Sequence, residues 1–403
     1  MNLFFNIEQF VGEAVTGRSE SLLQKDLANN HEALTEAIGG KSVLVIGGAG
    51  TIGSSFIRAL IRYHPKKLVV ADINENGLTE LVRDCRSRKD ITLPADFKSY
   101  PVNFGDKVFE KIFRQEGPFD IVANFAAHKH VRSEKDVFSI EAMIENNVLR
   151  AKRLLDLLLQ YPPQHFFCVS TDKAANPVNI MGASKKLMEE VILAYSGVLP
   201  ITTARFANVA FSNGSLLAGF IERVMRQQPL SCPSDVKRFF VSPQESGEIC
   251  LLACVLGKSG EIFFPKLDGE KDLVNFADIV APFLRRLGLE PQICSSEAEA
   301  REKAANLSGR NYPVYFFASD TSGEKLYEEF YTDEEELELD RFNQLGVIRN
   351  APRRSRAELD KMIGEIETLF TGNVDKSTIV QLLNKLLPNF QHIETGTNLD
   401  QKM

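Results

Sequence analysis

The chain has 403 residues, of which 44% are hydrophobic and 25% are charged, and its formal net charge is −7. This composition is ordinary for a folded globular protein, and it provides enough apolar residues for a large core. The negative charge and the absence of a basic run argue against nucleic-acid binding, so we expect no nucleic-acid partner.

The sequence predicts a cytoplasmic protein without a membrane span. The first eight residues lack the basic and long apolar regions of a signal peptide, and no stretch of about 18 apolar residues occurs. The cysteines do not show the paired spacing of a metal site, so we predict reduced, buried thiols and no bound metal. These cysteines are Cys85, Cys168, Cys232, Cys250, Cys254 and Cys294.

From residue 41 onward, short β-rich runs alternate with longer amphipathic segments. The expected strands are 42–47, 67–72, 97–102, 121–125, 165–170, 201–206 and 261–264. The expected helices are 52–62, 78–85, 108–115, 140–160 and 182–195. This alternation predicts an α/β fold of the Rossmann type, a doubly wound parallel sheet with helices on both faces.

Changes in composition divide the chain into four predicted regions. They are an N-terminal helical extension (1–40), a Rossmann domain (41–210) that also receives a strand near 261–264, a smaller α/β substrate-binding lobe (211–350) and a C-terminal helical extension (351–403). Apolar residues at helical spacing in both extensions predict that they cover a surface or a subunit contact. The acidic run 334–338 predicts a solvated helix face.

A glycine-rich turn follows the first predicted strand and precedes a helix. Gly47, Gly50 and Gly53 permit a tight turn and close approach of a pyrophosphate, and the following helix begins near Thr51 and Ile52. Such a motif can also be an ordinary loop, but its position between a strand and a helix favours a dinucleotide site.

Asp72 ends the second predicted strand. A carboxylate at this position can accept hydrogen bonds from both ribose hydroxyls of NAD and repels the 2′-phosphate of NADP, so we predict NAD. Three nearby arginines (83, 86 and 88) leave NADP open, and a capping role is the structural alternative. Asn103 and Asp106 follow the third strand, where they are placed to contact adenine or to form a turn.

The fifth predicted strand leads into Thr171, Asp172 and Lys173, and Met181 and Lys185 follow. In open α/β sheets the carboxyl ends of the strands face the ligand crevice. An isolated Asp-Lys pair is usually a solvated loop element. Together with the glycine turn, this pair predicts a catalytic site.

The segment from Ser170 to Lys185 resembles the active-site segment of the UDP-N-acetylglucosamine 4,6-dehydratases, which belong to the extended short-chain dehydrogenase/reductase superfamily. The resemblance covers about residues 41–350. Its motifs occur in the family's order: the glycine turn, Ala126-Ala127-His-Lys129-His130-Val131, Asn146-Asn147-Val148, Ser170-Thr-Asp-Lys173, Arg205-Phe-Ala-Asn208-Val209, Lys237-Arg238-Phe-Phe240 and Gly323-Glu-Lys325-Leu-Tyr-Glu-Glu329. It implies NAD as the cofactor, with Ala126 and Ala127 among its contacts, a UDP-N-acetylhexosamine as the substrate, and a homo-oligomer.

The sequence departs from the wider superfamily at one position. The usual Tyr-x-x-x-Lys pair appears as Met181-x-x-x-Lys185, and a methionine cannot relay a proton. This departure resembles a branch of large membrane-bound dehydratases that retain configuration at C5. We therefore predict retention at C5.

The resemblance implies specific roles for the catalytic residues. Asp172 is the acid that protonates the C6 hydroxyl, Lys173 is the base at C5, Thr171 bonds the C4 oxygen, and Lys185 holds the nicotinamide ribose. At neutral pH an exposed Asp is ionised and an exposed Lys is protonated, so these roles require the opposite charge states. Burial and nearby Lys185 would disfavour a charged Lys173, whereas the neighbouring Asp172 favours an ion pair.

The resemblance also implies two groups of substrate contacts. Lys129, His130 and Glu134 belong to the sugar-side loop, although His130 is also compatible with a structural role. The expected ligands of the nucleotide diphosphate are Asn208, Ser212, Asn213, Arg238 and Lys325. Two other functions stay open: a nucleotide-sugar epimerase on the same fold, and a non-catalytic NAD-binding regulatory module.

Overall fold

The computed structural model describes residues 5–319 and 327–393, and a nine-stranded sheet forms the centre of its large lobe. The sheet order is β14-β15-β10-β6-β5-β4-β1-β2-β3. The strands are β1 (Ser42–Ile46), β2 (Lys67–Asp72), β3 (Asp96–Pro101), β4 (Ile121–Asn124), β5 (His165–Val169), β6 (Ile201–Ala204), β10 (Glu261–Pro265), β14 (Leu337–Glu338) and β15 (Leu345–Ile348). The strands from β3 to β10 are parallel, β15 pairs antiparallel with β10, and β14 pairs antiparallel with β15. The predicted Rossmann-type α/β fold is confirmed, and each predicted strand lies within two residues of an observed one.

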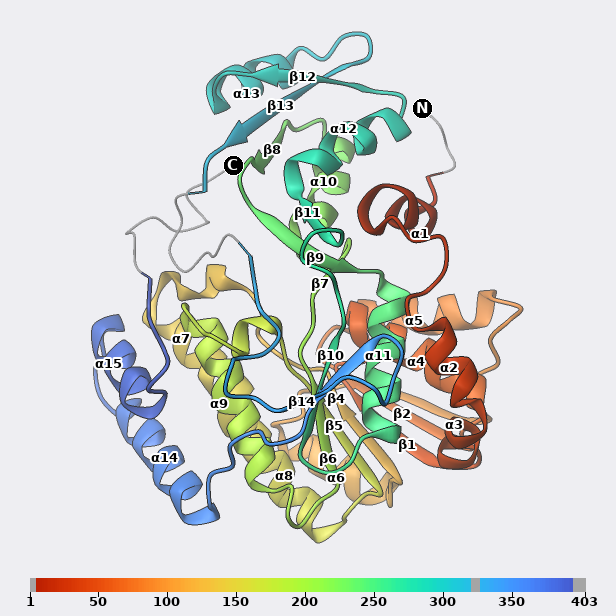
Figure 1. Ribbon diagram of the computed structural model, residues 1–403, viewed down its shortest axis with the longest axis vertical. Helices are drawn as coiled ribbons and strands as arrows, with labels where there is room; N and C mark the ends of the chain where they lie inside the picture. The colour runs from red at the N-terminus through yellow and green to blue at the C-terminus, as the bar shows by residue number, and fades with distance from the viewer. Residues whose placement is uncertain (1–4, 320–326, 394–403) are drawn as a thin grey trace.

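Helices cover both faces of this sheet (Figure 1). On one face α4 (Thr51–Leu60) packs against α11 (Pro243–Leu256) and α3 (His31–Ile38) lies beside them. The two helices approach so closely that a Cβ at Gly247 would lie 2.3 Å from the Ser55 backbone. On the other face α8 (Arg150–Gln160) packs against α9 (Ile180–Ala194). The remaining helices of this lobe are α2 (Gln24–Asn29), α5 (Glu75–Ser87), α6 (Lys107–Glu116) and α7 (Val137–Ile144), and a π-helical stretch (Glu145–Leu149) joins α7 to α8.

The small lobe lies at the top of Figure 1 and has its own hydrophobic core. One three-stranded sheet contains β7 (Asn208–Val209), β9 (Lys237–Val241) and β11 (Leu273–Asn275), and the other contains β8 (Leu230–Pro233), β12 (Glu290–Cys294) and β13 (Asn311–Phe317). The helices are α10 (Leu216–Met225), α12 (Phe276–Arg286) and α13 (Glu297–Ala305). Although α11, β10, β14 and β15 fall within residues 211–350, they belong to the large lobe.

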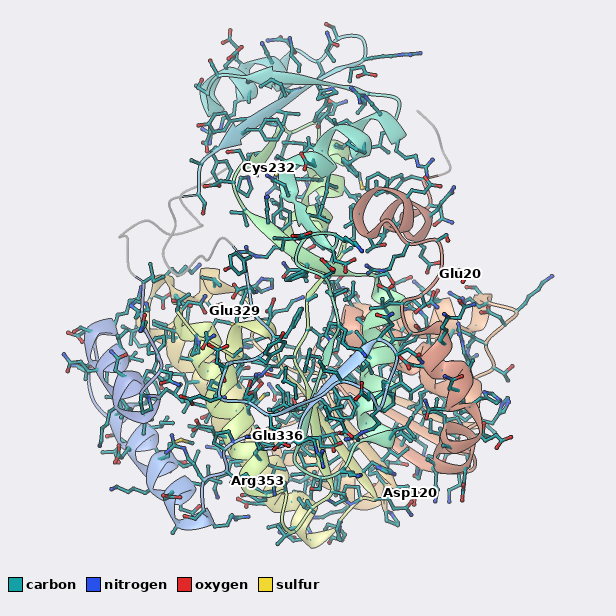
Figure 2. All side chains as sticks on the ribbon, viewed as in Figure 1. Glu20, Asp120, Cys232, Glu329, Glu336 and Arg353 are labelled. Carbon is teal, nitrogen blue, oxygen red and sulfur yellow. The ribbon has the colours of Figure 1, made fainter. Side chains whose placement is uncertain are left out.

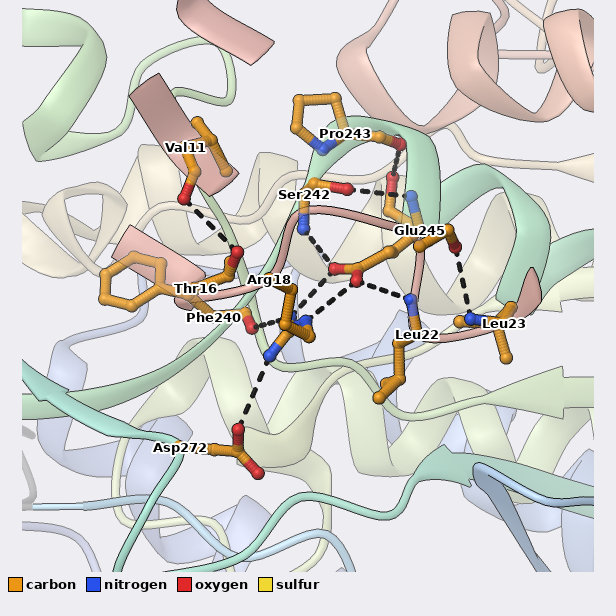
Figure 3. A network of polar contacts seen from close by, with 12 residues as sticks. Val11, Thr16, Arg18, Leu22, Leu23, Phe240, Ser242, Pro243, Glu245 and Asp272 are labelled. Carbon is orange, nitrogen blue, oxygen red and sulfur yellow. Dashed lines mark hydrogen bonds and ion pairs between the residues drawn. The ribbon is translucent and has the colours of Figure 1, made fainter. Parts of the chain in front are cut away.

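The N-terminal segment connects the two lobes. Phe10 of α1 (Ile7–Phe10) and Val15 of the following π-helical turn (Val11–Thr16) lie in the core of the small lobe, whereas Leu34 lies in the core of the large lobe. Between them, the Arg18 guanidinium donates to the Glu245 carboxylate at 2.9 Å and to the Phe240 carbonyl at 3.0 Å (Figure 3). Residues 5–40 therefore form part of both cores.

The C-terminal segment packs on α9 of the same chain. Helices α14 (Arg356–Leu369) and α15 (Lys376–Leu386) lie beside α9, and the buried side chains of Ile379 and Leu383 join the main core. Beyond α15, the backbone N–H groups of Gln391 and Ile393 donate to the carbonyls of residues 177 and 178. The apolar residues at helical spacing in this region therefore form a contact with α9 within the same chain.

The prediction of a solvated acidic helix at 334–338 is wrong for the helix and for Glu335, whereas Glu334 and Glu336 are exposed. Residues 334–338 form no helix, because they lie in a turn and in β14. Glu335 is not solvated: its carboxylate accepts two hydrogen bonds at 2.8 Å from the fully buried Arg205. All six cysteines are buried and unpaired. Within the described ranges, no helix is both long and apolar enough to cross a bilayer, and no three metal-ligating side chains come together.

Candidate active site

The glycine turn lies between β1 and α4. Gly47 has a φ of 75°, and a Cβ there would lie 2.5 Å from the Ala126 nitrogen. A Cβ at Gly53 would lie 2.3 Å from the Gly47 carbonyl oxygen, whereas one at Gly50 would make only an ordinary 3.5 Å contact. Gly47 and Gly53 are therefore required by geometry, and α4 begins at Thr51 with its amide end facing the turn.

Asp72 lies at the carboxyl end of β2, beside the glycine turn. One carboxylate oxygen accepts from the Ala49 N–H at 2.9 Å, and the other accepts from the Asn74 N–H at 2.8 Å. Each oxygen retains a lone pair for another donor. Asn103 and Asp106 line a nearby pocket of about 480 Å³ at the ends of β2 and β3.

The loop after β4 forms the opposite side of the turn. The Asn124 side chain accepts from the Ala126 N–H at 3.0 Å, and Ala127 follows. Asn147 accepts from the His128 N–H and donates to the Ser184 hydroxyl of α9, so it fixes this loop against α9. The sequence motif contained Asn147, but its role as this link was not predicted.

Thr171, Asp172 and Lys173 come together at the carboxyl end of β5. The Asp172 carboxylate accepts from the Thr171 hydroxyl at 2.8 Å, from the Lys173 backbone N–H at 2.9 Å and from the Lys173 ammonium at 3.1 Å. Burial lowers the pKa of Lys173, but the carboxylates of Asp172 and Glu328 outweigh burial and hold the pKa above its ordinary value. The two carboxylates therefore favour the ammonium form of Lys173.

A buried ion-pair network supports this strand end from behind. Ser170, the residue before Thr171, donates to the Glu189 carboxylate at 2.6 Å. Arg205, which is fully buried, binds the Glu189 carboxylate with two nitrogens and also binds Glu335. Burial would raise the pKa of Glu189, but Arg205 and the other partners lower it to about 2. The network escaped prediction because its members lie far apart in the sequence.

The beginning of α9 holds Met181 and Lys185. Both residues are 3% exposed, and the Met181 backbone N–H donates to the Glu134 carboxylate at 3.0 Å. The Lys185 ammonium donates to the Val169 carbonyl at 2.6 Å, and burial lowers the pKa of Lys185. The carboxylates of Asp172 and Glu328, rather than Lys185, are the main charges that act on Lys173.

A pocket of about 490 Å³ opens beside Lys173, between the two lobes. The predicted residues in its wall are Lys129, His130, Lys173, Asn208, Ser212 and Arg238, and apolar side chains of the small lobe complete it. Two predicted contacts lie elsewhere, and the position of a third is not described. Glu134 is buried against α9, the Asn213 backbone N–H donates to the Thr51 hydroxyl at 3.0 Å, and Lys325 lies outside the described residues.

Two residues near the pocket were not predicted. Arg223 of α10 lies in the pocket wall, and it had no motif that could identify it. Glu328 is 4% exposed, and one carboxylate oxygen lies 3.6 Å from the Lys173 ammonium. Glu328 stood within a quoted motif, but only the fold shows which of its acidic residues points inward.

Residues 43–350 match the polysaccharide biosynthesis protein family. The chain belongs to this family. The uncharacterized membrane protein MJ1061 of Methanocaldococcus jannaschii is 31% identical, over 76% of this chain and 85% of that protein. The probable polysaccharide biosynthesis protein EpsC of Bacillus subtilis is 27% identical over 64% of this chain, which spans only 44% of that relative.

Other relatives of this polysaccharide biosynthesis family member carry two different activities. The inverting UDP-N-acetylglucosamine 4,6-dehydratase of Campylobacter jejuni is 26% identical over 61% of this chain and 72% of its own length. The UDP-glucose 4-epimerase of Rickettsia felis is 25% identical over 88% of this chain and 97% of its own length. Similarity alone therefore does not choose between elimination and epimerisation.

Solved structures agree with the fold. The structure of Pen from Bacillus thuringiensis has a TM-score of 0.62 and 20% identity, and the match covers 82% of this chain and 98% of that one. The NAD complex of dTDP-glucose 4,6-dehydratase from Bacillus anthracis has a TM-score of 0.51 and 16% identity, with 73% and 88% covered.

Proposed function

We propose that the protein is an NAD-dependent UDP-N-acetylhexosamine 4,6-dehydratase, with UDP-N-acetylglucosamine or a close analogue as substrate and with retention at C5. The observation that carries the proposal is the Asp172–Lys173 pair, in contact at 3.1 Å beside a pocket that contains Lys173 itself. A simple 4-epimerase needs no acid at C6 and no base at C5.

The large lobe has the features that NAD requires. The turn at Gly47 and Gly53 leaves no room for side chains, so a pyrophosphate can approach its backbone and the amino end of α4. Asp72 has spare acceptor capacity for ribose hydroxyls, and Asn103 and Asp106 line the pocket on the adenine side. When bound there, NAD would accept a hydride from C4 and return it to C6.

The pocket between the lobes suits an anionic nucleotide sugar. Its wall contains Lys129, Lys173, Arg223 and Arg238, and Glu222 is the acidic residue in the same wall. Arg238 is 6% exposed, so an incoming diphosphate would be held with little competition from water. Phe276 and Phe317 offer apolar surface for the base or the acyl group.

Proton movements follow from the contacts at β5. The C4 hydroxyl proton can pass through the Thr171 hydroxyl to Asp172, which then holds the proton that the departing C6 hydroxyl needs. Neutral Lys173 removes the C5 proton, the resulting ammonium exchanges its hydrogens with solvent, and Lys173 then delivers a solvent-derived proton to the same face of C5, which gives retention. The cycle begins and ends with Asp172 ionised and Lys173 neutral, so the resting ammonium must first lose one proton.

The test is mass spectrometry of the product formed from UDP-N-acetylglucosamine in heavy water. We expect loss of one water and a 4-keto-6-deoxy sugar with one solvent deuterium at C5, while the hydrogen added at C6 comes from C4. Asp172→Asn and Lys173→Met should each slow elimination on the order of a hundredfold or more while NAD still binds. An epimer of unchanged mass from the wild-type protein would exclude the dehydratase and favour the epimerase alternative.

A further inference from the structure

We propose that Glu328 is a positioning residue that anchors the Lys173 side chain and keeps it an ammonium until the site is loaded. The effect of Glu328 on elimination rests on the proposed dehydratase function. The effect of the Glu328 charge on Lys173 does not rest on that function.

The geometry places Lys173 between two carboxylates. Its ammonium lies 3.1 Å from Asp172 and 3.6 Å from Glu328, and both carboxylates belong to residues that are 4% exposed. Water therefore screens neither interaction strongly. Asp172 adjoins Lys173 in sequence, whereas Glu328 reaches it from a segment more than 150 residues away and thus depends on the fold.

A second contact holds this segment beside the catalytic loop. Asn176 lies three residues after Lys173, and its side-chain amide donates to the Glu329 carboxylate at 2.9 Å. Figure 2 shows Glu329 at the boundary between the lobes. Neighbouring Glu328 points inward and Glu329 is exposed, so the two adjacent acids have different roles.

The charges around Lys173 determine how easily it loses its proton. Asp172 and Glu328 favour the ammonium, while burial and Arg238 oppose it. In the proposed cycle Lys173 is already neutral when Asp172 receives the C4 proton, and the protonated Asp172 then no longer favours a charged Lys173. Glu328 does not take part in that proton transfer, so its carboxylate continues to favour the protonated form of Lys173.

The experiment compares Glu328→Gln with Glu329→Gln, which removes the same charge one residue away and keeps an acceptor for Asn176. Acetylation of Lys173 by acetic anhydride is followed by mass spectrometry of the full chain's peptides from pH 7 to 10, because only the neutral amine reacts. We expect Glu328→Gln to acetylate at least about tenfold faster at pH 8, a change of about one in pKa. Glu329→Gln should match the wild type.

Turnover supplies the second readout. In Glu328→Gln the limb of the pH profile of kcat/KM that reports Lys173 should move to lower pH, a change that loss of packing alone would not produce. If Glu328→Gln does not fold, Glu328→Asp, which withdraws the carboxylate by one methylene, should shift acetylation in the same direction by less. Unchanged acetylation in a folded Glu328 variant would overturn the inference. A shift in acetylation without any water loss by the wild type would instead reject the dehydratase function and leave the charge relation standing.

Discussion

Replacing Arg205 by methionine tests the buried ion-pair network beside the carboxyl end of β5. Arg205 and Glu189 have fully buried side chains, and the Glu335 side chain is 5% exposed. The substitution keeps an apolar side chain of comparable length, but it leaves two carboxylates without their cation. Removing one partner of a buried ion pair costs about 3–5 kcal/mol of unfolding free energy.

The pKa of Glu189 gives an independent magnitude. A fall from the ordinary 4.5 to about 2 corresponds to about 3 kcal/mol, at about 1.4 kcal/mol for each pKa unit. Because the folded pKa is the lower one, this stabilisation is fully present above pH 4.5 and is lost as the pH falls towards 2. In Arg205→Met the carboxylates can escape the penalty by protonation, so the deficit should be smaller at pH 5 than at pH 8.

Urea unfolding followed by circular dichroism measures both effects. Arg285→Met is the matched control, because its pair with Glu290 lies at the surface with both side chains more than half exposed and should contribute less than about 1 kcal/mol. Adding Glu189→Gln and Glu335→Gln to Arg205→Met should recover much of the loss, since the uncompensated charges disappear. Equal stability of Arg205→Met and Arg285→Met would refute the reasoning.

Three further predictions concern the cofactor and the missing tyrosine. Gly53→Ala should abolish NAD binding in calorimetry because its Cβ would lie 2.3 Å from a carbonyl oxygen of the turn, whereas Gly50→Ala, with 3.5 Å available, should still bind. Asp72→Ala should raise the affinity for NADP relative to NAD in the same assay, and a wild type that prefers NADP would contradict the ribose assignment. Met181→Ala should retain turnover while Lys185→Ala impairs both NAD binding and turnover; complete inactivity of folded Met181→Ala would show that Met181 supplies an essential function.

The sequence predicted the parts of the fold that depend on local pattern. Short runs rich in β-branched and aromatic residues predict most of the parallel strands, and the glycine turn predicts where α4 begins, because both signals lie within a few neighbouring residues. The prediction for the acidic run 334–338 failed because it depends on a contact that is distant in sequence. Its charge suggested solvent, but Glu335 is paired with Arg205, which is 130 residues away in sequence. A buried charge cannot be recognised from sequence until its partner is known.

The same limit applied to the candidate site. Lys129, His130 and Lys173 follow the ends of β4 and β5 and could be predicted, because the carboxyl ends of parallel strands meet at one edge. The small-lobe residues of the pocket wall were predicted only from the family resemblance. Glu134 was assigned to the sugar, yet the structure places its carboxylate on the Met181 N–H at the beginning of α9. A loop motif identifies residues near a site, but the direction of each side chain depends on the helix packed behind it.

The lobes contribute to the proposed chemistry in different ways, and the N-terminal segment links those contributions. Lys173 stands on the large lobe, whereas Arg238 lies on β9 of the small lobe, and both line one pocket. The distance between the catalytic pair and a bound diphosphate therefore depends on how the lobes are held together. Arg18 bonds to Glu245 at the start of α11 and to the carbonyl of Phe240, two residues beyond Arg238 on β9. Arg18 thus holds the strand that carries Arg238, for which we propose phosphate binding. This contact gives residues 5–40 a part in defining the site, although they do not line the pocket.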